Sequence, residues 1–183
     1  MPRIPFKAKN IAEPKDIVDP IRARRGGTLL DLDCMLLYSP RFAKGWNALL
    51  GAVRSELSLA PKLRELAICA VAKLNDAEYE FSQHAPEFLK AGGTEEQVAA
   101  LSELLPSGTS ETSTIDGAPF DAAERAVLRL TSEMTRQVKV DDATFSAVRA
   151  ALPDDSQLVE LVGVIATYNL VSRFLVAFEI EPE

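Results

Sequence analysis

The sequence predicts an all-α fold, a single domain of about seven or eight helices. Apolar residues recur every three or four positions along most of the 183 residues, as they do on amphipathic helices, and almost no segment alternates as a strand does. Helix start signals, both capping boxes and prolines at first helical positions, recur along the chain. With 47% hydrophobic residues, a chain of this length can bury one good core but is short for two independent domains.

The start signals and the apolar periodicity place seven helices. Ser39-Pro40 opens a helix that runs to about residue 55. Its apolar stripe consists of Phe42, Trp46, Leu49, Leu50 and Val53. The next helix, opened by Pro61, is apolar around its whole circumference, which predicts a central, buried position. The expected ranges after the first helix are 60–74, 77–90, 94–104, 121–137, 142–152 and 156–178.

Three local features define the ends and connections of these helices. Pro86 lies inside the predicted 77–90 helix, so we expect that helix to bend or restart there. Gly92 and Gly93 suit a left-handed cap at its end, and the segments 94–97 and 121–124 read as capping boxes. Residues 106–119 are rich in Ser, Thr and Gly and predict a long flexible loop.

The net charge and the cysteines indicate which binding partners and which cellular compartment to expect. The formal net charge of −7 argues against nucleic acid and anionic membranes as partners. No apolar signal core is present at the N-terminus, and no apolar run approaches the roughly 18 residues needed to span a bilayer. Cys34 and Cys69 form neither a CxxC pair nor a metal-ligand pattern. We therefore expect a cytoplasmic protein without a membrane partner.

A basic cluster near the N-terminus is the local exception to the acidic composition. The run Arg22-Ala23-Arg24-Arg25-Gly26-Gly27 places three guanidinium groups within four residues. Such a cluster could hold a carboxylate substrate or an acidic neighbouring subunit, or it could be a solvated or interface cluster.

Polar residues on helices that should be buried are the candidate site. Glu80 and His84 are four residues apart, on the same face of the 77–90 helix, a spacing that suits an acid/base pair. His84 is the only histidine of the chain. Glu65 begins the apolar 60–74 helix, where it could join that pair or simply favour the positive end of the helix dipole.

The last predicted helix carries two further candidates, Tyr168 and Arg173. An arginine on a mostly apolar helix needs an anion, which could be Glu65, Glu179 or a bound substrate. Tyr168 and Arg173 are therefore the candidate substrate-binding residues.

Three segments resemble the core of the carboxymuconolactone decarboxylase and AhpD-like alkylhydroperoxidase family. They are Leu63-Arg64-Glu65-Leu66-Ala67-Ile68, Tyr79-Glu80-Phe81-Ser82-Gln83-His84 and Ala91-Gly92-Gly93-Thr94-Glu95-Glu96-Gln97. The resemblance covers roughly residues 40–105, and the flanks at 25–27 and 168–173 resemble the longer members. It implies an AhpD-like helical bundle that assembles as a homotrimer or homohexamer.

The sequence lacks the two cysteines that the alkylhydroperoxidase branch of this family uses. That branch uses a CxxCxxxH motif and a glutamate twelve residues before its first cysteine. Here His84 and Glu65 match the histidine and the glutamate, while Ala77 and Glu80 stand at the two cysteine positions, with Tyr79 between them. Peroxide reduction through a disulfide needs a nucleophilic thiolate and a resolving partner. CxxC-dependent hydroperoxidase activity is therefore not expected.

The remaining groups suit proton transfer beside a carbonyl or lactone. The resemblance favours a decarboxylase or a related lyase or isomerase acting on a small carboxylate or lactone. In this hypothesis His84 protonates the carbanion or enolate, Glu80 and Glu65 tune and orient it, and Tyr79 donates a hydrogen bond. No cofactor is expected.

Three alternatives stay open at this stage. Glu65, Glu80 and His84 could bind a divalent metal, although a single histidine makes us expect no metal site. Cys69 or a separate partner could support a peroxidase, but Cys69 lies in an apolar run typical of an inert core cysteine. The chain could also be a non-catalytic oligomeric interaction protein. Apolar helices at 60–74 and 156–178 favour self-association under every alternative.

Overall fold

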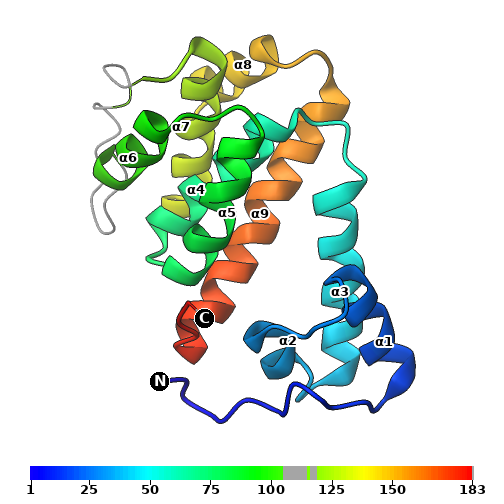
Figure 1. Ribbon diagram of the computed structural model, residues 1–183. Coiled ribbons are helices and arrows are strands. Elements are labelled where there is room, and N and C mark those ends of the chain that lie inside the picture. The colour runs from blue at the N-terminus through cyan, green and yellow to red at the C-terminus, as the bar shows by residue number, and fades with distance from the viewer. Residues whose placement is uncertain (105–114, 116–118, 183) are drawn as a thin grey trace. The chain divides into compact units, whose positions relative to one another are not determined.

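A computed structural model describes residues 1–104, 115 and 119–182 (Figure 1). These residues form nine α-helices, labelled α1 to α9, and no strand. The all-α class is confirmed, with a helix count slightly above the seven or eight expected. The predicted flexible loop at 106–119 lies outside the described residues, apart from Ile115 and Pro119.

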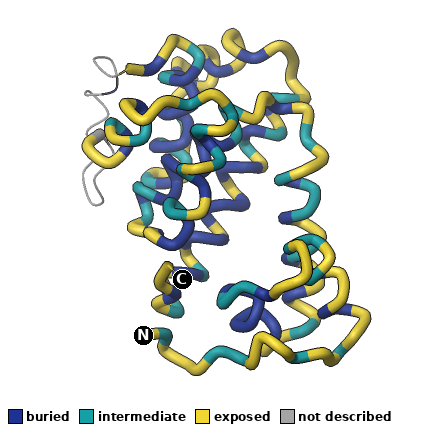
Figure 2. Tube along the Cα trace, in the orientation of Figure 1, coloured by how far each residue is buried: buried dark blue, intermediate teal, exposed yellow. Residues whose placement is uncertain are grey.

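The described residues divide into two compact units. The first unit contains residues 1–57 and 177–181, and the second contains residues 58–176. Each unit has buried residues of its own (Figure 2). The single-domain organisation expected from the sequence stays a prediction.

The first unit contains α1 (Lys15–Arg24), α2 (Asp31–Leu36) and α3 (Pro40–Ser55). The sequence did not predict α1 and α2, because Pro20 lies inside α1 and α2 has only six residues. In α3, Trp46 is buried as expected, whereas Phe42 and Leu49 are 46% and 43% exposed. The predicted apolar stripe of α3 is therefore only partly buried.

The arginine cluster of the first unit contacts groups within that unit. Arg25 makes two hydrogen bonds, of 3.0 and 3.2 Å, to the carboxylate of the buried Asp33. Arg24 lies 3.8 Å from the same carboxylate. Arg22 donates to two backbone carbonyls of the preceding segment at 2.9 and 2.7 Å. These contacts favour a structural role over the binding of a carboxylate substrate.

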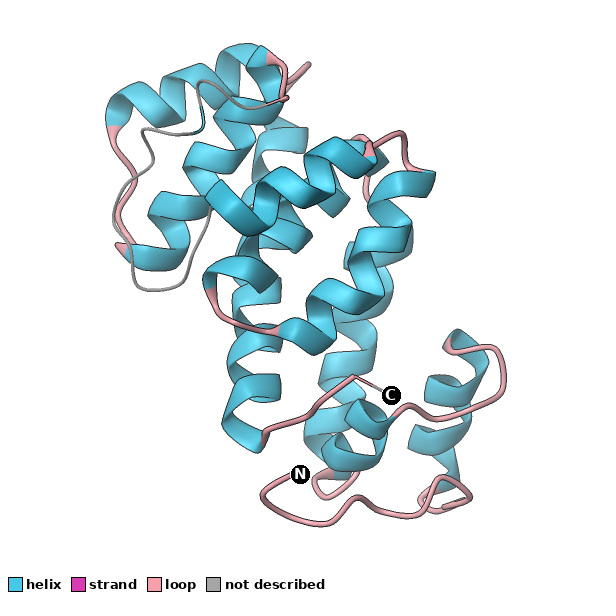
Figure 3. Cartoon of the chain, turned by 60° about the vertical axis from the view of Figure 1, so that its left-hand side comes forward, coloured by secondary structure: helices cyan, strands magenta, loops and turns pink. Residues whose placement is uncertain are grey.

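The second unit contains α4 (Pro61–Leu74), α5 (Glu78–Lys90), α6 (Glu95–Leu104), α7 (Ala122–Arg136), α8 (Asp142–Ala151) and most of α9 (Asp155–Phe178). Figure 3 shows the described residues as helices connected by loops and turns. Every residue of α4 from 65 to 72 is buried, and α4 packs against α5 and α7. The central position that the sequence predicts for α4 is confirmed.

The expectation that the helix restarts at Pro86 is wrong. The described helix α5 continues through Pro86 to Lys90. The cap that follows is the predicted one: Gly92 has a φ of +100°, and the Gly93 N–H donates to the carbonyl of Phe88 at 2.9 Å. A Cβ atom at position 93 would lie 2.6 Å from the Phe88 ring, so this position requires glycine.

The last helix, α9, corrects the membrane expectation drawn from the sequence. Its 24 residues are long and apolar enough, by length and composition alone, to cross a bilayer. Half of its apolar stretch is buried within the protein, and the core helix of a soluble protein passes the same test. One such helix is weak evidence for a membrane span.

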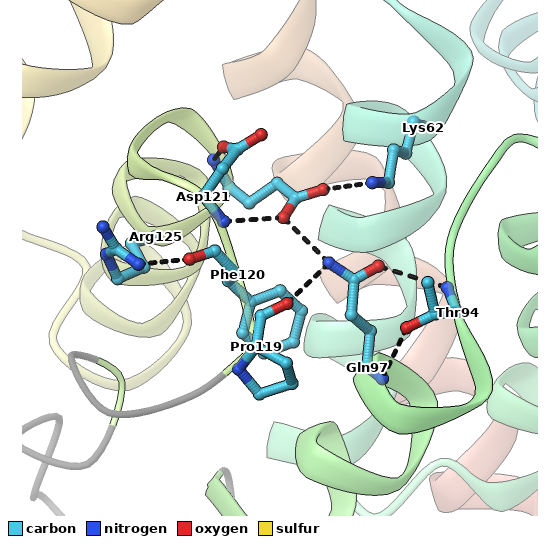
Figure 4. Close-up of polar contacts among 8 residues, drawn as sticks. Lys62, Thr94, Gln97, Pro119, Phe120, Asp121 and Arg125 are labelled. Atoms are coloured by element: carbon cyan, nitrogen blue, oxygen red, sulfur yellow. Dashed lines mark hydrogen bonds and ion pairs between the residues drawn. The ribbon is translucent and has the colours of Figure 1, made fainter.

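Both predicted capping boxes are present, and a hydrogen bond joins them (Figure 4). At the start of α6, Thr94 and Gln97 exchange hydrogen bonds of 3.1 and 3.2 Å. At the start of α7, Asp121 and Glu124 do the same at 2.8 and 2.9 Å. The Gln97 amide donates to Glu124 Oε2 at 2.9 Å, and Lys62 Nζ lies 2.6 Å from Glu124 Oε1. This capping network ties α4, α6 and α7 together.

Candidate active site

Three helices of the second unit bring five polar side chains into one buried group. We call it the polar cluster: Glu65 on α4, Glu80 and His84 on α5, and Tyr168 and Ser172 on α9. All five are buried, with at most 5% of the residue surface exposed. Buried polar groups require partners, so the contacts inside the cluster define its chemistry.

Glu65 and His84 form a buried pair. The Oε2 atom of Glu65 lies 2.7 Å from Nδ1 of His84, and Arg64 donates to Oε1 of Glu65 at 3.2 Å. Burial by itself raises the pKa of Glu65, but the hydrogen bond and charge of His84, aided by Arg64, outweigh it and lower the pKa. An ionised carboxylate can only accept hydrogen bonds, so Nδ1 of His84 carries a proton. The other ring nitrogen, Nε2, takes no part in this contact.

Glu80 has a different environment from Glu65. Its Oε1 atom lies 2.9 Å from the hydroxyl of Ser172, and its Oε2 atom is buried without a hydrogen-bond partner in the described part of the chain. Burial raises the pKa of Glu80 well above the usual 4.5, and the contact with Ser172 offsets only part of that effect. The site therefore holds one ionised carboxylate and a second carboxyl group that favours its neutral form.

Two contacts one helical turn apart connect α5 to α9. The rings of His84 and Tyr168 meet edge to face, with centroids 4.9 Å apart at 86°. One turn away, Glu80 meets Ser172. Because both pairs are spaced by four residues, one face of α5 is matched to one face of α9.

Cys69 lies in α4 one turn after Glu65 and is fully buried. Burial strongly raises the pKa of its thiol, and the negative charge of Glu65 raises it further. Because the thiolate is the reactive form of cysteine, this environment suppresses a nucleophilic role. The structure supports the expectation of an inert core cysteine.

The predicted site residues do not all meet. Glu65, Glu80, His84 and Tyr168 lie together in the polar cluster. Tyr79 is buried on α5, but successive residues point roughly 100° apart around a helix, so it lies on a neighbouring face to Glu80. Its proposed hydrogen bond to substrate stays a prediction.

Arg173 lies outside the polar cluster, on the exposed side of α9. Its Nη1 atom donates to the backbone carbonyl and the side-chain oxygen of Asn169, at 3.1 and 2.8 Å. The expectation that a carboxylate of Glu65 or Glu179 pairs with it is wrong. Glu65 pairs with His84 and Arg64, and Glu179 with Arg3.

Sequence reasoning missed Ser172, which contacts Glu80. The available signal was its position four residues after Tyr168 on a mostly apolar helix, which places both on one face.

Among residues 1–104, 115 and 119–182, no group of three or more His, Cys, Asp or Glu side chains is arranged to hold a metal ion.

A sequence profile of the carboxymuconolactone decarboxylase family matches residues 40–106, the segment that carries Glu65, Glu80 and His84. No match to curated protein sequences was found.

Solved structures resemble the whole chain at low sequence identity. An AhpD-core, peroxidase-related protein from Ralstonia eutropha has a TM-score of 0.79 at 18% identity, covering 100% of this chain and 92% of its own. A peroxidase-related protein from Silicibacter sp. has a TM-score of 0.76 at 17% identity, covering 100% and 94%.

The debrominase Bmp8, solved in complex with 2,3,4-tribromopyrrole, has a TM-score of 0.75 at 15% identity, covering 100% of this chain and 94% of its own. At these identities the likeness concerns the fold. Residues 40–106 therefore resemble the carboxymuconolactone decarboxylase family, and the chain that contains them has the all-α AhpD-like fold.

Proposed function

We propose that the polar cluster is the acid/base centre of an enzyme, a decarboxylase or a related lyase or isomerase that acts on a small carboxylate or lactone. The observation that carries this proposal is the buried 2.7 Å contact between Glu65 Oε2 and His84 Nδ1. A carboxylate that holds one imidazole nitrogen fixes the ring and leaves the other nitrogen for proton transfer.

In the proposed decarboxylation, the bond between the substrate carbon and its carboxylate breaks and carbon dioxide leaves. The electron pair stays on the carbon as a carbanion or enolate. Protonated His84 donates the Nε2 proton to that carbon, and the Glu65 carboxylate stabilises the imidazolium through Nδ1. His84 then takes a proton from water. In an isomerisation, neutral His84 removes a proton and returns it at another carbon.

Glu80 supports this chemistry by staying neutral. An ionised carboxylate at this place would repel an anionic substrate, since like charges at short range disfavour each other. Neighbouring carboxyl groups whose pKa values are displaced in opposite directions are typical of acid/base sites. Here the pKa of Glu65 is lowered and the pKa of Glu80 is raised.

Two alternative functions are less well supported. A thiol-dependent peroxidase would need a reactive cysteine, and the environment of Cys69 suppresses its thiolate. A non-catalytic network would leave its buried polar atoms paired, but Oε2 of Glu80 has no hydrogen-bond partner among the described residues. A buried acceptor of this kind favours a site that receives a ligand.

The proposal is tested with a panel of small keto acids, lactones and unsaturated carboxylates in deuterated water. Release of carbon dioxide and incorporation of deuterium at carbon are followed by NMR. His84→Asn retains an amide N–H near the position of Nδ1 and removes Nε2. We expect it to lower kcat about 100- to 10,000-fold on any substrate that the wild type converts, the usual contribution of a general acid or base.

The matched control is Gln83→Ala, an exposed neighbour on the same helix, which should leave kcat unchanged. Circular dichroism and urea unfolding confirm that each variant is folded. A His84→Asn variant that turns over at the wild-type rate contradicts the assignment.

A further inference from the structure

We propose that Ser172 is a positioning residue that anchors Glu80 as a neutral carboxylic acid, whose Oε2 atom accepts a hydrogen bond from a hydroxyl, enol or N–H group of the ligand. The anchoring stands on the contacts of the polar cluster alone, whereas the assignment of Oε2 to a ligand rests on the proposed function.

The hydroxyl group of Ser172 lies near two oxygen atoms but has only one proton to donate. Its hydroxyl oxygen lies 2.9 Å from Oε1 of Glu80 and 2.9 Å from the backbone carbonyl of Tyr168. A hydroxyl group has one proton and donates to one of them only. The Tyr168 carbonyl can only accept, so when Ser172 donates to it, the contact with Glu80 needs a proton on Oε1. Glu80 then donates to Ser172.

Other placements of the protons on Ser172 and Glu80 are more costly. If Ser172 donates to Glu80, an ionised Glu80 leaves a buried charge with only one hydrogen bond. If Glu80 is then protonated on Oε2, that buried O–H donor has no acceptor. The ionised form and the form protonated on Oε2 therefore each leave a buried group unsatisfied, which is costly. With the proton on Oε1, only a neutral carbonyl oxygen stays unsatisfied, which is the least costly outcome.

The Oε2 atom of Glu80 can bind a hydrogen-bond donor of a ligand. In the favoured arrangement it is a neutral acceptor with both lone pairs available, buried on the α5 face that also carries His84. A hydroxyl, enol or N–H group satisfies it, whereas a carboxylate has no proton to offer. Such a ligand extends a chain of hydrogen bonds from its own donor through Glu80 and Ser172 to the Tyr168 carbonyl.

Infrared spectroscopy of the resting protein tests the anchoring without any substrate. At neutral pH we expect a carbonyl stretch of a protonated carboxyl group that is absent from Glu80→Gln. Ser172→Ala should shift the frequency of that band, and Ser172→Thr, which keeps the hydroxyl, should restore it. The matched control is Ser132→Ala, which truncates a buried serine on α7 and should leave the band in place.

Two results overturn the anchoring. The first is a wild-type protein without a protonated carboxyl band at neutral pH, and the second is a band that Ser172→Ala does not move. Carbon-13 spectra of glutamate-labelled wild type decide the first point even when Glu80→Gln does not fold, because a protonated carboxyl carbon differs in shift from an ionised one. These measurements need no turnover, so their failure is distinct from failure of the proposed function.

The ligand assignment is tested with glycolate and acetate, which differ by one hydroxyl group. Glycolate should shift the Glu80 band, because its hydroxyl can donate to Oε2, and acetate should not. Equal effects of the two ions, or no effect of glycolate, overturn the assignment of Oε2 to a ligand donor.

Discussion

Glu65 and Glu80 lie in the same buried cluster but differ in what surrounds their carboxyl groups. Glu65 accepts hydrogen bonds from His84 and Arg64, whereas the carboxyl group of Glu80 forms a hydrogen bond with the hydroxyl of Ser172. Folding therefore lowers the pKa of one and raises that of the other. Because a pKa that differs between folded and unfolded states makes stability depend on pH, the two residues have opposite effects on stability.

We predict opposite pH dependence for Glu65→Gln and Glu80→Gln. The lowered pKa of Glu65 gives stability that is present above 4.5, its ordinary value, and is lost as the pH falls through the folded pKa. Glu65→Gln should therefore lower the free energy of unfolding at pH 7, by about 1–3 kcal/mol for a hydrogen bond to a charged group, and the deficit should shrink below pH 4.5.

For Glu80 the sign is reversed. Its raised pKa gives stability that is fully present below 4.5 and is lost as the pH rises toward the folded pKa. Glu80→Gln does not titrate, so its stability relative to the wild type should increase as the pH rises above 4.5. Urea unfolding from about pH 3 to pH 8 measures both differences, with exposed Glu96→Gln as control. Differences that do not change with pH contradict both assignments.

At the residue scale, the sequence predicted Glu65, Glu80 and His84 as a group but missed Ser172. The spacing of Glu80 and His84 places them on one face of one helix, which periodicity can establish. Which face of α9 meets that face depends on packing between helices, and no pattern within a single segment contains that information. The carboxylate partner expected for Arg173 was wrong for the same reason, because Asn169 on its own helix is its partner.

At the scale of the helix, the capping network gives a stability prediction. Gln97 donates to Glu124 and to the backbone carbonyl of Pro119, each at 2.9 Å, and caps α6 as well. Gln97→Ala removes these bonds and should lower the free energy of unfolding by about 1–3 kcal/mol. Glu96→Ala, an exposed neighbour in the same helical turn, should change it by less than about 0.5 kcal/mol. If urea unfolding shows that Gln97→Ala and Glu96→Ala lower the free energy of unfolding equally, the capping network does not contribute to stability.

Helices with strong local signals were the ones predicted correctly. The capping boxes at Thr94 and Asp121 and the fully apolar circumference of α4 are properties of short segments, and the structure contains all three. The helices α1 and α2 lack such signals, and Pro86 is accommodated inside α5. Tertiary packing can override weak local preferences in cases of this kind.

At the scale of the whole molecule, we predict a homotrimer or homohexamer. Large apolar side chains are exposed on two helices. On α9 these are Val159, Leu170 and Val176, with 70%, 41% and 44% of their surface exposed. On α3 they are Phe42 and Leu49, at 46% and 43%. Exposed apolar side chains repeated along a helix favour association with another chain. Sedimentation equilibrium should give three or six times the mass of one chain, 19.9 kDa. A species of one chain mass contradicts the prediction.

The measurement that tests the acid/base centre most directly is the nitrogen-15 NMR spectrum of His84, the only histidine of the chain, so its signals need no assignment. The structure predicts an imidazole whose Nδ1 carries a proton, held by the Glu65 carboxylate, and an Nε2 signal that moves when a small carboxylate or lactone binds. Glu65→Gln removes the carboxylate that accepts from Nδ1, so the nitrogen-15 signal of a protonated Nδ1 should weaken. An Nδ1 atom without a proton, or an Nε2 signal that no ligand of the panel moves, would contradict the acid/base centre.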